Sequence, residues 1–370
     1  MAAKLEVGFP VYCVLASASA TADLDAFHII CGGGGGGVKS GVPNGLALYK
    51  FDPRTFGFTK LHFLSSHGDA VMCLSRLSGR KFVAGVDKQV WKVAIGEERL
   101  WLLSHTQADF SGSEDADADA DASADADGYV RLVNCDEDTG LIMTAGSDDL
   151  VRLWTTFDED EWSEHDPGCL SVKDIVDCAF IGSSQIMSVE RDQGMVLFSG
   201  SRFEHKDFIN LSIPLGYQIK CVRMISSDTV ILALINRKEK QSLILFFENT
   251  TLKETGLKPT GVSFRIKGSL ITTAYGRNTF LAVGCSDGRV LCIDSNGKCI
   301  LDNQNAHSFA VTSVMIHDDQ YLISGSADGT ILVTRLYVYS RQIDNVLLVL
   351  MSLILLLLAY LIQSWNTRYL

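Results

Sequence analysis

The sequence has 370 residues, enough for one large domain or two ordinary ones, and its 47% apolar and 21% charged residues exclude a disordered chain. Eight acidic residues between Asp109 and Gly128 account for most of the net charge of −12 and leave about −4 elsewhere. The clustered Lys and Arg that indicate nucleic-acid binding are missing from the sequence, so this class is also excluded.

The first apolar run, Phe9 to Ala16, follows Lys4 and has some features of a signal peptide. The run is short, and Glu6 and Pro10 disturb it, so we interpret it as an extended strand. Because the N-terminal run is then not a signal peptide, we expect all residues before the apolar segment near the C-terminus to lie in the cytosol.

A run of six glycines, Gly32 to Gly37, precedes Val38, Lys39 and Ser40. A phosphate-binding P-loop needs GxxxxGK[ST], and here Val38 shifts Lys39 by one position. A P-loop also continues into a helix, whereas the residues from Gly41 to Gly45, which include Pro43, forbid a helix there. The sequence therefore argues against hydrolysis of ATP or GTP by this chain.

Six consecutive glycines cost backbone entropy on ordering, so they suit a loop whose backbone itself makes the contacts. Peptide carbonyls in such a loop can turn inward around a monovalent cation, as in channel filters. The alternative is a slack, low-complexity linker. Composition does not separate the two interpretations.

Short β-rich runs end in similar turns along the chain, and the clearest, Ala145 to Trp154, is close to a WD-repeat signature. The turn residues are Asn44, Asp87, Asp148, Asp192, Lys238, Asp287 and Asp328. Their spacing matches the period of about 40 to 45 residues for propeller blades once the acidic stretch 109–128 is left out of the count. We therefore predict an all-β, seven-bladed, WD-repeat-like propeller over residues 1–340; six blades plus a degenerate segment at Lys238 is the alternative.

A propeller ring must close, and we expect the strand at Phe9 to Ala16 to complete the blade begun by the C-terminal strands. The acidic insert 109–128 alternates Asp with Ala or Ser between two blades. A calcium-binding EF-hand that used Asp127 and Gly128 would need Glu at position 134, where the residue is Asn134. We expect a solvated, disordered loop instead.

Near the C-terminus, residues 346–362 are apolar except for Ser352 and Tyr360. As a helix these residues span roughly 25 Å, which suffices for a thin bilayer such as that of the endoplasmic reticulum (ER). We predict a single transmembrane helix over 346–362, a juxtamembrane linker over 341–345 and a short luminal tail over 363–370. This layout is typical of a tail anchor.

The ten cysteines include no CxxC pair and no zinc spacing, and most lie in apolar runs. This usage indicates core-filling residues in a reducing compartment. We also find no Ser/His/Asp, Cys/His or paired-carboxylate arrangement above chance, so covalent catalysis and a small-molecule substrate are not expected.

The chain resembles the ER-membrane guanine-nucleotide exchange factors for the Sar-type GTPase that initiates COPII coats, the family of prolactin regulatory element-binding protein. The resemblance covers nearly the whole chain. It rests on Gly8 to Tyr12, the glycine run with Lys39 to Asn44, the propeller period, Ala306 to Thr312 and the C-terminal anchor. It implies exchange activity at the ER membrane in ER-to-Golgi transport, with the propeller in the cytosol.

By this resemblance, the backbone of Gly32, Gly33, Gly34, Gly35, Gly36 and Gly37 holds a potassium ion. Ser40, Val42, Pro43 and Asn44 then form the tip that inserts into the GTPase, and Lys39 and Gly41 support it. His307 is a weaker candidate for the same rim, because a structural blade histidine is the commoner role; His67 is expected to be structural. The competing hypothesis is a membrane-anchored WD-repeat scaffold without exchange activity.

Overall fold

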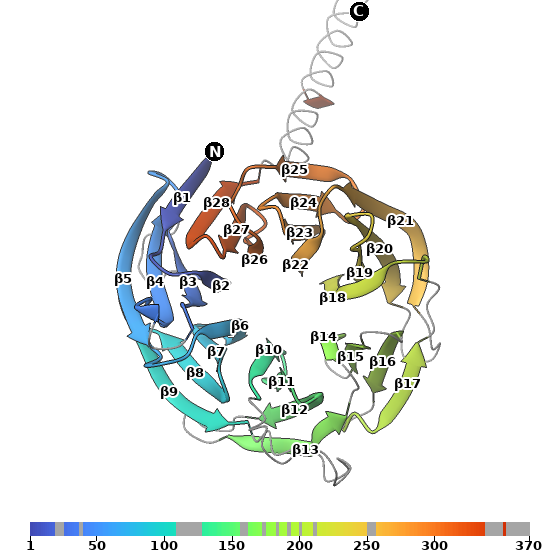
Figure 1. The fold of residues 1–370 in the computed structure, drawn as a ribbon, viewed down its shortest axis with the longest axis horizontal. Coiled ribbons are helices and arrows are strands. Elements are labelled where there is room, and N and C mark those ends of the chain that lie inside the picture. Colours follow the sequence, from blue (N-terminus) through green and yellow to red (C-terminus); the bar gives the residue numbers. More distant parts are fainter. Residues whose placement is uncertain are drawn as a thin grey trace, which may run out of the picture.

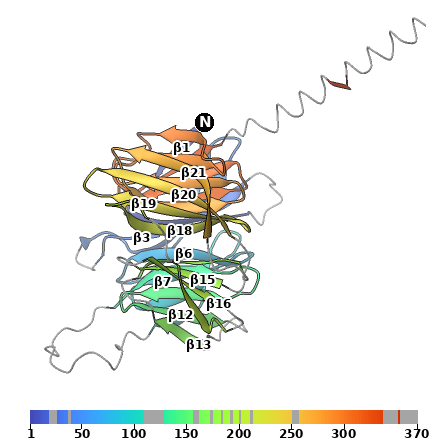
Figure 2. The same cartoon turned by 90° about the vertical axis from the view of Figure 1, so that its right-hand side faces the viewer.

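The computed structural model describes residues 1–18, 26–36, 40–108, 128–155, 162–171, 175–182, 185–190, 194–199, 202–209, 213–249, 257–336 and 351–352. These residues form seven four-stranded antiparallel sheets, or blades, arranged in a closed ring (Figure 1). Seen from the side, the ring is a flattened disc (Figure 2). The predicted seven-bladed, all-β propeller is therefore confirmed.

Each blade places its first strand nearest the ring axis and its fourth strand at the rim (Figure 1). Blade 1 contains β2 (Val11–Ala18), β3 (Phe27–Gly33), β4 (Gly45–Asp52) and β5 (Gly57–Ser65). Blade 2 contains β6 (Val71–Ser78), β7 (Lys81–Val86), β8 (Gln89–Ile95) and β9 (Leu100–Gln107). Blade 3 contains β10 (Val130–Cys135), β11 (Ile142–Gly146), β12 (Leu150–Thr155) and β13 (Ser163–Ser171).

The same order continues around the second half of the ring. Blade 4 contains β14 (Ile175–Phe180), β15 (Gln185–Glu190), β16 (Gly194–Ser199) and β17 (His205–Ile209). Blade 5 contains β18 (Gln218–Ser226), β19 (Thr229–Asn236), β20 (Gln241–Asn249) and β21 (Leu257–Lys267). Blade 6 contains β22 (Ile271–Arg277), β23 (Phe280–Cys285), β24 (Val290–Asp294) and β25 (Cys299–Asn303).

Blade 7 closes the ring with the N-terminal end of the chain. Its strands are β26 (Val311–His317), β27 (Tyr321–Ser326), β28 (Thr330–Arg335) and β1 (Ala2–Glu6). The expectation that Phe9 to Ala16 completes this blade is wrong, because β1 pairs with β28 from Ala2–Thr334 to Glu6–Thr330. The apolar run Phe9 to Ala16 instead leads into β2, the innermost strand of blade 1.

The middle strands carry continuous apolar runs because neighbouring blades cover both of their faces. In β19, for example, every residue from Val230 to Asn236 is buried. The rim strands face water on one side; in β17, four of the five residues are exposed. Apolar clusters fill the spaces between blades, such as the one that joins Ile323 and Ile331 of blade 7 to Val14 and Ile29 of blade 1.

Consecutive connections in an antiparallel blade lie alternately on the two faces of the ring. The connections from second to third strand, and those from one blade to the next, therefore share one face, here called the glycine-loop face. Hydrogen bonds link the two kinds of connection, for example Ala108 N to Lys88 O at 2.9 Å and Val7 N to Gly329 O at 2.8 Å. The chain leaves β28 after Arg335 on the opposite face.

Three predicted segments fall wholly or mainly outside the described residues. They are the transmembrane helix 346–362 with its linker and luminal tail, the acidic insert 109–128, of which only Gly128 is described, and residues 37–39, which include Gly37 and Lys39 of the predicted site. Within the described residues, no helix combines the length and the apolar character needed to cross a bilayer.

Candidate functional site

The glycine loop, residues 34–44, joins β3 to β4 in blade 1. The equivalent connections in blades 2 to 7 contain only two to four residues, as between Val86 and Gln89 in blade 2 or Ser326 and Thr330 in blade 7. The loop therefore extends a connection that has no more than four residues in every other blade. Its position is the second-to-third turn that the repeat spacing predicted at Asn44.

The first two residues of the glycine run belong to the sheet and not to the loop. Gly32 pairs with Cys13 and Leu46, and Gly33 pairs with Val11 and Gly45. Both are buried, and a Cβ at Gly33 would lie 1.9 Å from the carbonyl oxygen of Pro10. Packing alone accounts for these two glycines. Of the six glycines expected to hold an ion, the described ones that lie in the loop are Gly34, Gly35 and Gly36.

The next three glycines form the first half of the loop. The amide of Gly34 donates to the carbonyl of Pro10 at 3.1 Å. Gly34 and Gly36 have φ values of 146° and 78°, which L residues rarely adopt. A Cβ at Gly35 would lie 2.5 Å from Cβ of Val42, so the two halves of the loop pack directly against each other.

Asn44 holds the end of the loop. Its side chain is buried, with 8% of the residue exposed, and its amide nitrogen donates to the carbonyls of Gly36 at 2.6 Å and Gly68 at 2.7 Å. Its own carbonyl accepts from the amide of Ser66 at 3.1 Å. Among the described residues, the side-chain oxygen of Asn44 has no hydrogen-bond partner. Asn44 is therefore an anchor within the loop and not part of an exposed tip.

The tip of the loop consists of residues 40–43. Ser40, Gly41 and Pro43 are exposed, while Val42 is half-buried against the apolar cluster that contains Phe9. The amide of Val42 donates to Oγ of Ser40 at 3.3 Å. Val42 thus fixes the tip on the blade, and the three exposed residues face solvent.

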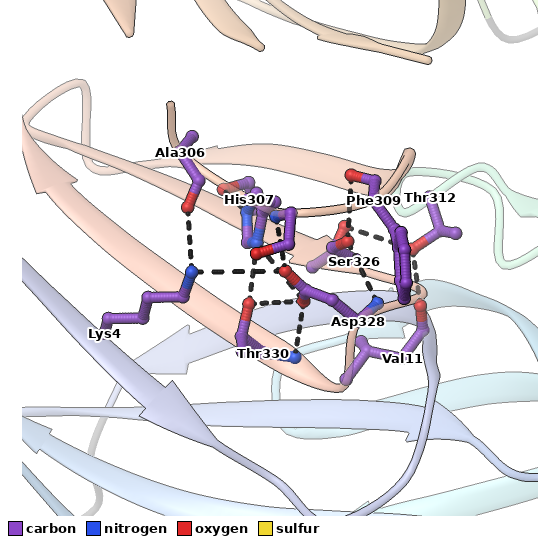
Figure 3. A network of polar contacts seen from close by, with 12 residues as sticks. Lys4, Val11, Ala306, His307, Phe309, Thr312, Ser326, Asp328 and Thr330 are labelled. Atoms are coloured by element: carbon purple, nitrogen blue, oxygen red, sulfur yellow. Dashed lines mark hydrogen bonds and ion pairs between the residues drawn. The ribbon is translucent and has the colours of Figure 1, made fainter. Parts of the chain in front are cut away.

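His307 lies elsewhere, inside a polar network of blade 7 (Figure 3). Its Nδ1 is 2.8 Å from Oγ1 of Thr330, and its Nε2 is 2.8 Å from Oγ of Ser324. Thr330 donates its hydroxyl proton to Asp328 at 2.5 Å, so its oxygen accepts from Nδ1 of His307. In the neutral histidine the proton is therefore on Nδ1, and Nε2 accepts from the Ser324 hydroxyl.

Burial lowers the pKa of His307 to about 4, and the nearby Asp328 carboxylate, 3.7 Å away, only partly offsets it. Burial raises the pKa of Asp328, but hydrogen bonds from Thr330 and Ser308 outweigh it and leave the pKa below its ordinary value. Since the His307 side chain has no exposed surface, its contacts support the structural role and not a place on the partner-facing rim.

Lys4 connects this network to ring closure. Its ammonium group donates to the carbonyl of Ala306 at 3.2 Å and lies 4.0 Å from the Asp328 carboxylate (Figure 3). Lys4 belongs to β1, which comes from the opposite end of the chain. The network therefore joins the N-terminal strand to the turn of blade 7.

His67 differs from its expected structural role. It is exposed, has a φ of 60°, and precedes Gly68, whose carbonyl accepts from Asn44. The segment that contains His67 joins blade 1 to blade 2 on the glycine-loop face. The backbone of the half-buried Gly68 fixes this segment to Asn44, and His67 is a surface residue beside the loop.

Sequence reasoning missed exposed apolar residues on the same face. Phe309, with 64% of its surface exposed, lies between blades 6 and 7, and Met72 and Tyr129 lie at or near the starts of inner strands. The sequence feature that could have identified these residues is an apolar side chain in or beside a connection between two blades. Among the described residues, no group of three or more His, Cys, Asp or Glu is placed to hold a metal ion.

Comparison with known proteins places one repeat within a described family. Residues 297–334 match the family model for the WD domain, G-beta repeat. This range contains His307 and most of blade 7. No curated protein sequence matches the chain.

The ring as a whole is similar to a solved structure, the WD40 β-propeller domain of Doa1. The two share 11% sequence identity with a TM-score of 0.57, over 90% of this chain and 95% of the other. At this identity the similarity shows the fold alone. The chain therefore contains a WD40-type seven-bladed propeller in which one second-to-third connection, the glycine loop, is extended.

Proposed function

We propose that this chain is a guanine-nucleotide exchange factor for a Sar-type small GTPase at the ER membrane, where it starts COPII coat assembly. The observation that carries the proposal is the glycine loop. It replaces a tight turn of two to four residues, is held at both ends by hydrogen bonds, and presents Ser40, Gly41 and Pro43 to solvent. The resemblance of Gly8 to Tyr12 and of the loop sequence to this family adds support.

The proposed mechanism needs binding and no bond-making by this chain. An exchange factor binds the nucleotide-free GTPase more tightly than the GDP-bound form, and by linkage the same difference weakens GDP binding. The contacts of Gly34 with Pro10 and of Asn44 with Gly36 and Gly68 fix the two ends of the loop before the partner arrives. Less ordering entropy is then lost on binding.

The proposal includes a potassium ion at the base of the loop. The buried side-chain oxygen of Asn44 lacks a partner among the described residues, and a Cβ at Gly34 would lie 1.9 Å from it. This oxygen and the carbonyls of Gly34 and Gly35 would hold the ion, because uncharged oxygens suit a weakly charged cation. When bound, the ion would supply positive charge that draws these oxygens together and stiffens the loop.

The proposed anchor, residues 346–362, follows the exit of the chain on the face opposite the glycine loop. The loop would then point away from the point of attachment and into the cytosol. Membrane attachment raises the effective concentration of a GTPase that works at the same bilayer.

The test is GDP release from a Sar-type GTPase, measured with a fluorescent GDP analogue and the full chain in neutral detergent. We compare Gly41→Ala at the loop tip with Gly140→Ala, a glycine on the opposite face. Their φ values are 71° and 72°, and neither has a neighbour within 4 Å of an added Cβ. Each substitution costs about 1 kcal/mol of stability.

Exchange that is lowered about tenfold or more by Gly41→Ala, and left unchanged by Gly140→Ala, supports the proposal. Equal activity of the two variants and the wild-type protein would show that the loop tip makes no contact with the GTPase. No activity in the wild-type protein would instead favour the scaffold hypothesis.

A further inference from the structure

A second surface on the glycine-loop face lies in blade 5, across the ring from blade 1 (Figure 1). Its turn between β19 and β20 contains Arg237, Lys238 and Lys240, all exposed, with Glu239 as its one acidic residue. Arg265 and Lys267 are exposed on β21, whose end reaches the same face, and Lys267 pairs with Gln241 beside the turn. We call these five cations the blade 5 patch.

Leu215 lies beside this patch and is fully exposed, at 101% of its reference surface. It occupies a turn in which the amide of Tyr217 donates to the carbonyl of Pro214 at 3.1 Å. The turn packs on blade 5, since the Tyr217 hydroxyl donates to the side chain of Gln241 at 3.2 Å. A Cβ at Gly216 would also lie 3.1 Å from the Asn236 side chain. Leu215 is therefore held outward on a fixed support.

The charges of the blade 5 patch are uncompensated within the described part of the chain. None of its five cations has an ion-pair partner there, although the whole protein carries a net charge of −12. Five cations against the single glutamate of the turn give a positive field that attracts acidic ligands. An exposed apolar side chain beside such charges is a feature of binding surfaces, because burying it in a partner adds free energy to the electrostatic attraction.

We propose that the blade 5 patch, together with Leu215, binds an acidic segment of a partner protein that carries an apolar side chain. Carboxylates of the segment pair with Lys238, Lys240 and Lys267, and its apolar side chain packs on Leu215. A protein segment is favoured over anionic lipid because the patch lies on the face opposite the exit of the chain after Arg335. This preference rests on the proposed membrane anchor, whereas the patch itself does not depend on exchange activity.

The experiment measures binding of a fluorescein-labelled Glu-rich peptide with a central leucine to the full chain in neutral detergent, by fluorescence anisotropy. A matched peptide has Gln at every Glu position. The double charge reversal of Lys238→Glu with Lys240→Glu is expected to raise Kd about tenfold, and Leu215→Ala about threefold. Binding is expected to weaken as salt is added, because the contacts are exposed to solvent.

The matched control is Lys298→Glu with Arg335→Glu, which reverses two exposed charges on the opposite face and should leave Kd unchanged. Thermal unfolding of each variant separates lost binding from lost folding. Two results would overturn the proposal: equal Kd values for the two double variants, or equal binding of the Glu and Gln peptides. Binding to phosphatidylserine vesicles that Lys238→Glu with Lys240→Glu abolishes, without any peptide binding, would assign the patch to lipid instead.

Discussion

Blade 7 joins its second and third strands through three residues, Ala327 to Gly329, whereas blade 1 uses the eleven residues of the glycine loop at the same position. In blade 7 the polar groups of the turn are directed inward. Asp328 accepts from the amides of Ser308 and Thr330, and the turn holds His307 through the Thr330 hydroxyl. In blade 1 the corresponding connection leaves Ser40, Gly41 and Pro43 exposed, and among its described residues Asn44 and Val42 hold it through their side chains.

One short segment links the two regions. Val7 donates its amide to the carbonyl of Gly329 in blade 7, and Pro10 accepts from the amide of Gly34 in the glycine loop. Both residues lie between β1, which closes the ring, and β2, which starts blade 1. Ring closure therefore also supports the base of the loop, and a change in one should affect the other.

The largest effect is expected from Asp328→Ala. Removing this half-buried carboxylate takes the acceptor from the amides of Ser308 and Thr330 and from the Thr330 hydroxyl, and we expect a loss of about 3 kcal/mol in the free energy of unfolding. Chemical denaturation measures it. The control is Asp287→Ala in the turn of blade 6, an exposed residue that accepts from Arg289 at 3.2 Å, with an expected loss of about 1 kcal/mol. Equal losses would contradict the closure role of the blade 7 turn.

A smaller effect is expected from Gly34→Ala at the base of the glycine loop. The added Cβ would lie 1.9 Å from the Asn44 side-chain oxygen at a φ of 146°, so Asn44 must move, at a cost of about 2 kcal/mol. Gly182→Ala, at a φ of 69° with no neighbour within 4 Å, serves as control and should cost about 1 kcal/mol. Limited proteolysis should cut Gly34→Ala faster in the loop region. An unchanged cleavage pattern would mean that Asn44 does not fix the loop.

The smallest effect concerns pH. Burial lowers the pKa of His307 and of His317 to about 4, below the value of about 6.5 in an unfolded chain. Stability from these groups is complete above pH 6.5 and is lost as pH falls toward 4, because the unfolded chain binds protons first. Each histidine should contribute about 1 kcal/mol of loss between about pH 6.5 and 5.5. His307→Gln should reduce the pH dependence of the free energy of unfolding by the contribution of one histidine. A pH dependence equal to that of the wild-type protein would refute the lowered pKa of His307.

The blade count followed from the turn spacing because each blade repeats one local motif. The weakest member, Lys238, is indeed a second-to-third turn, in blade 5. The closing strand was assigned wrongly for a physical reason. Ala2 to Glu6 alternates exposed and half-buried residues and carries Lys4, so it lacks the apolar run of an inner strand. Only its pairing with β28 identifies it.

The glycine loop was located from the sequence, but its internal division was not. Glycine has no side chain to show a strand pattern, so nothing in the sequence separates Gly32 and Gly33 of β3 from Gly34 in the loop. The burial of Asn44 likewise depends on Gly68, 24 residues away, which no local pattern indicates. The exposure of His67 was also not predictable, because its neighbour Gly68, and not His67, contacts Asn44.

The most direct test of the role of the glycine loop gives blade 1 the short connection of blade 7. Residues 34–44 of blade 1 are replaced by Ala-Asp-Gly, the sequence of the blade 7 turn, and GDP release from a Sar-type GTPase is measured in parallel with thermal unfolding. We expect the propeller still to unfold cooperatively, because every other blade joins these strands through at most four residues, while exchange falls to the uncatalysed rate. A folded variant that retains wild-type exchange would contradict the claim that the glycine loop acts on the partner.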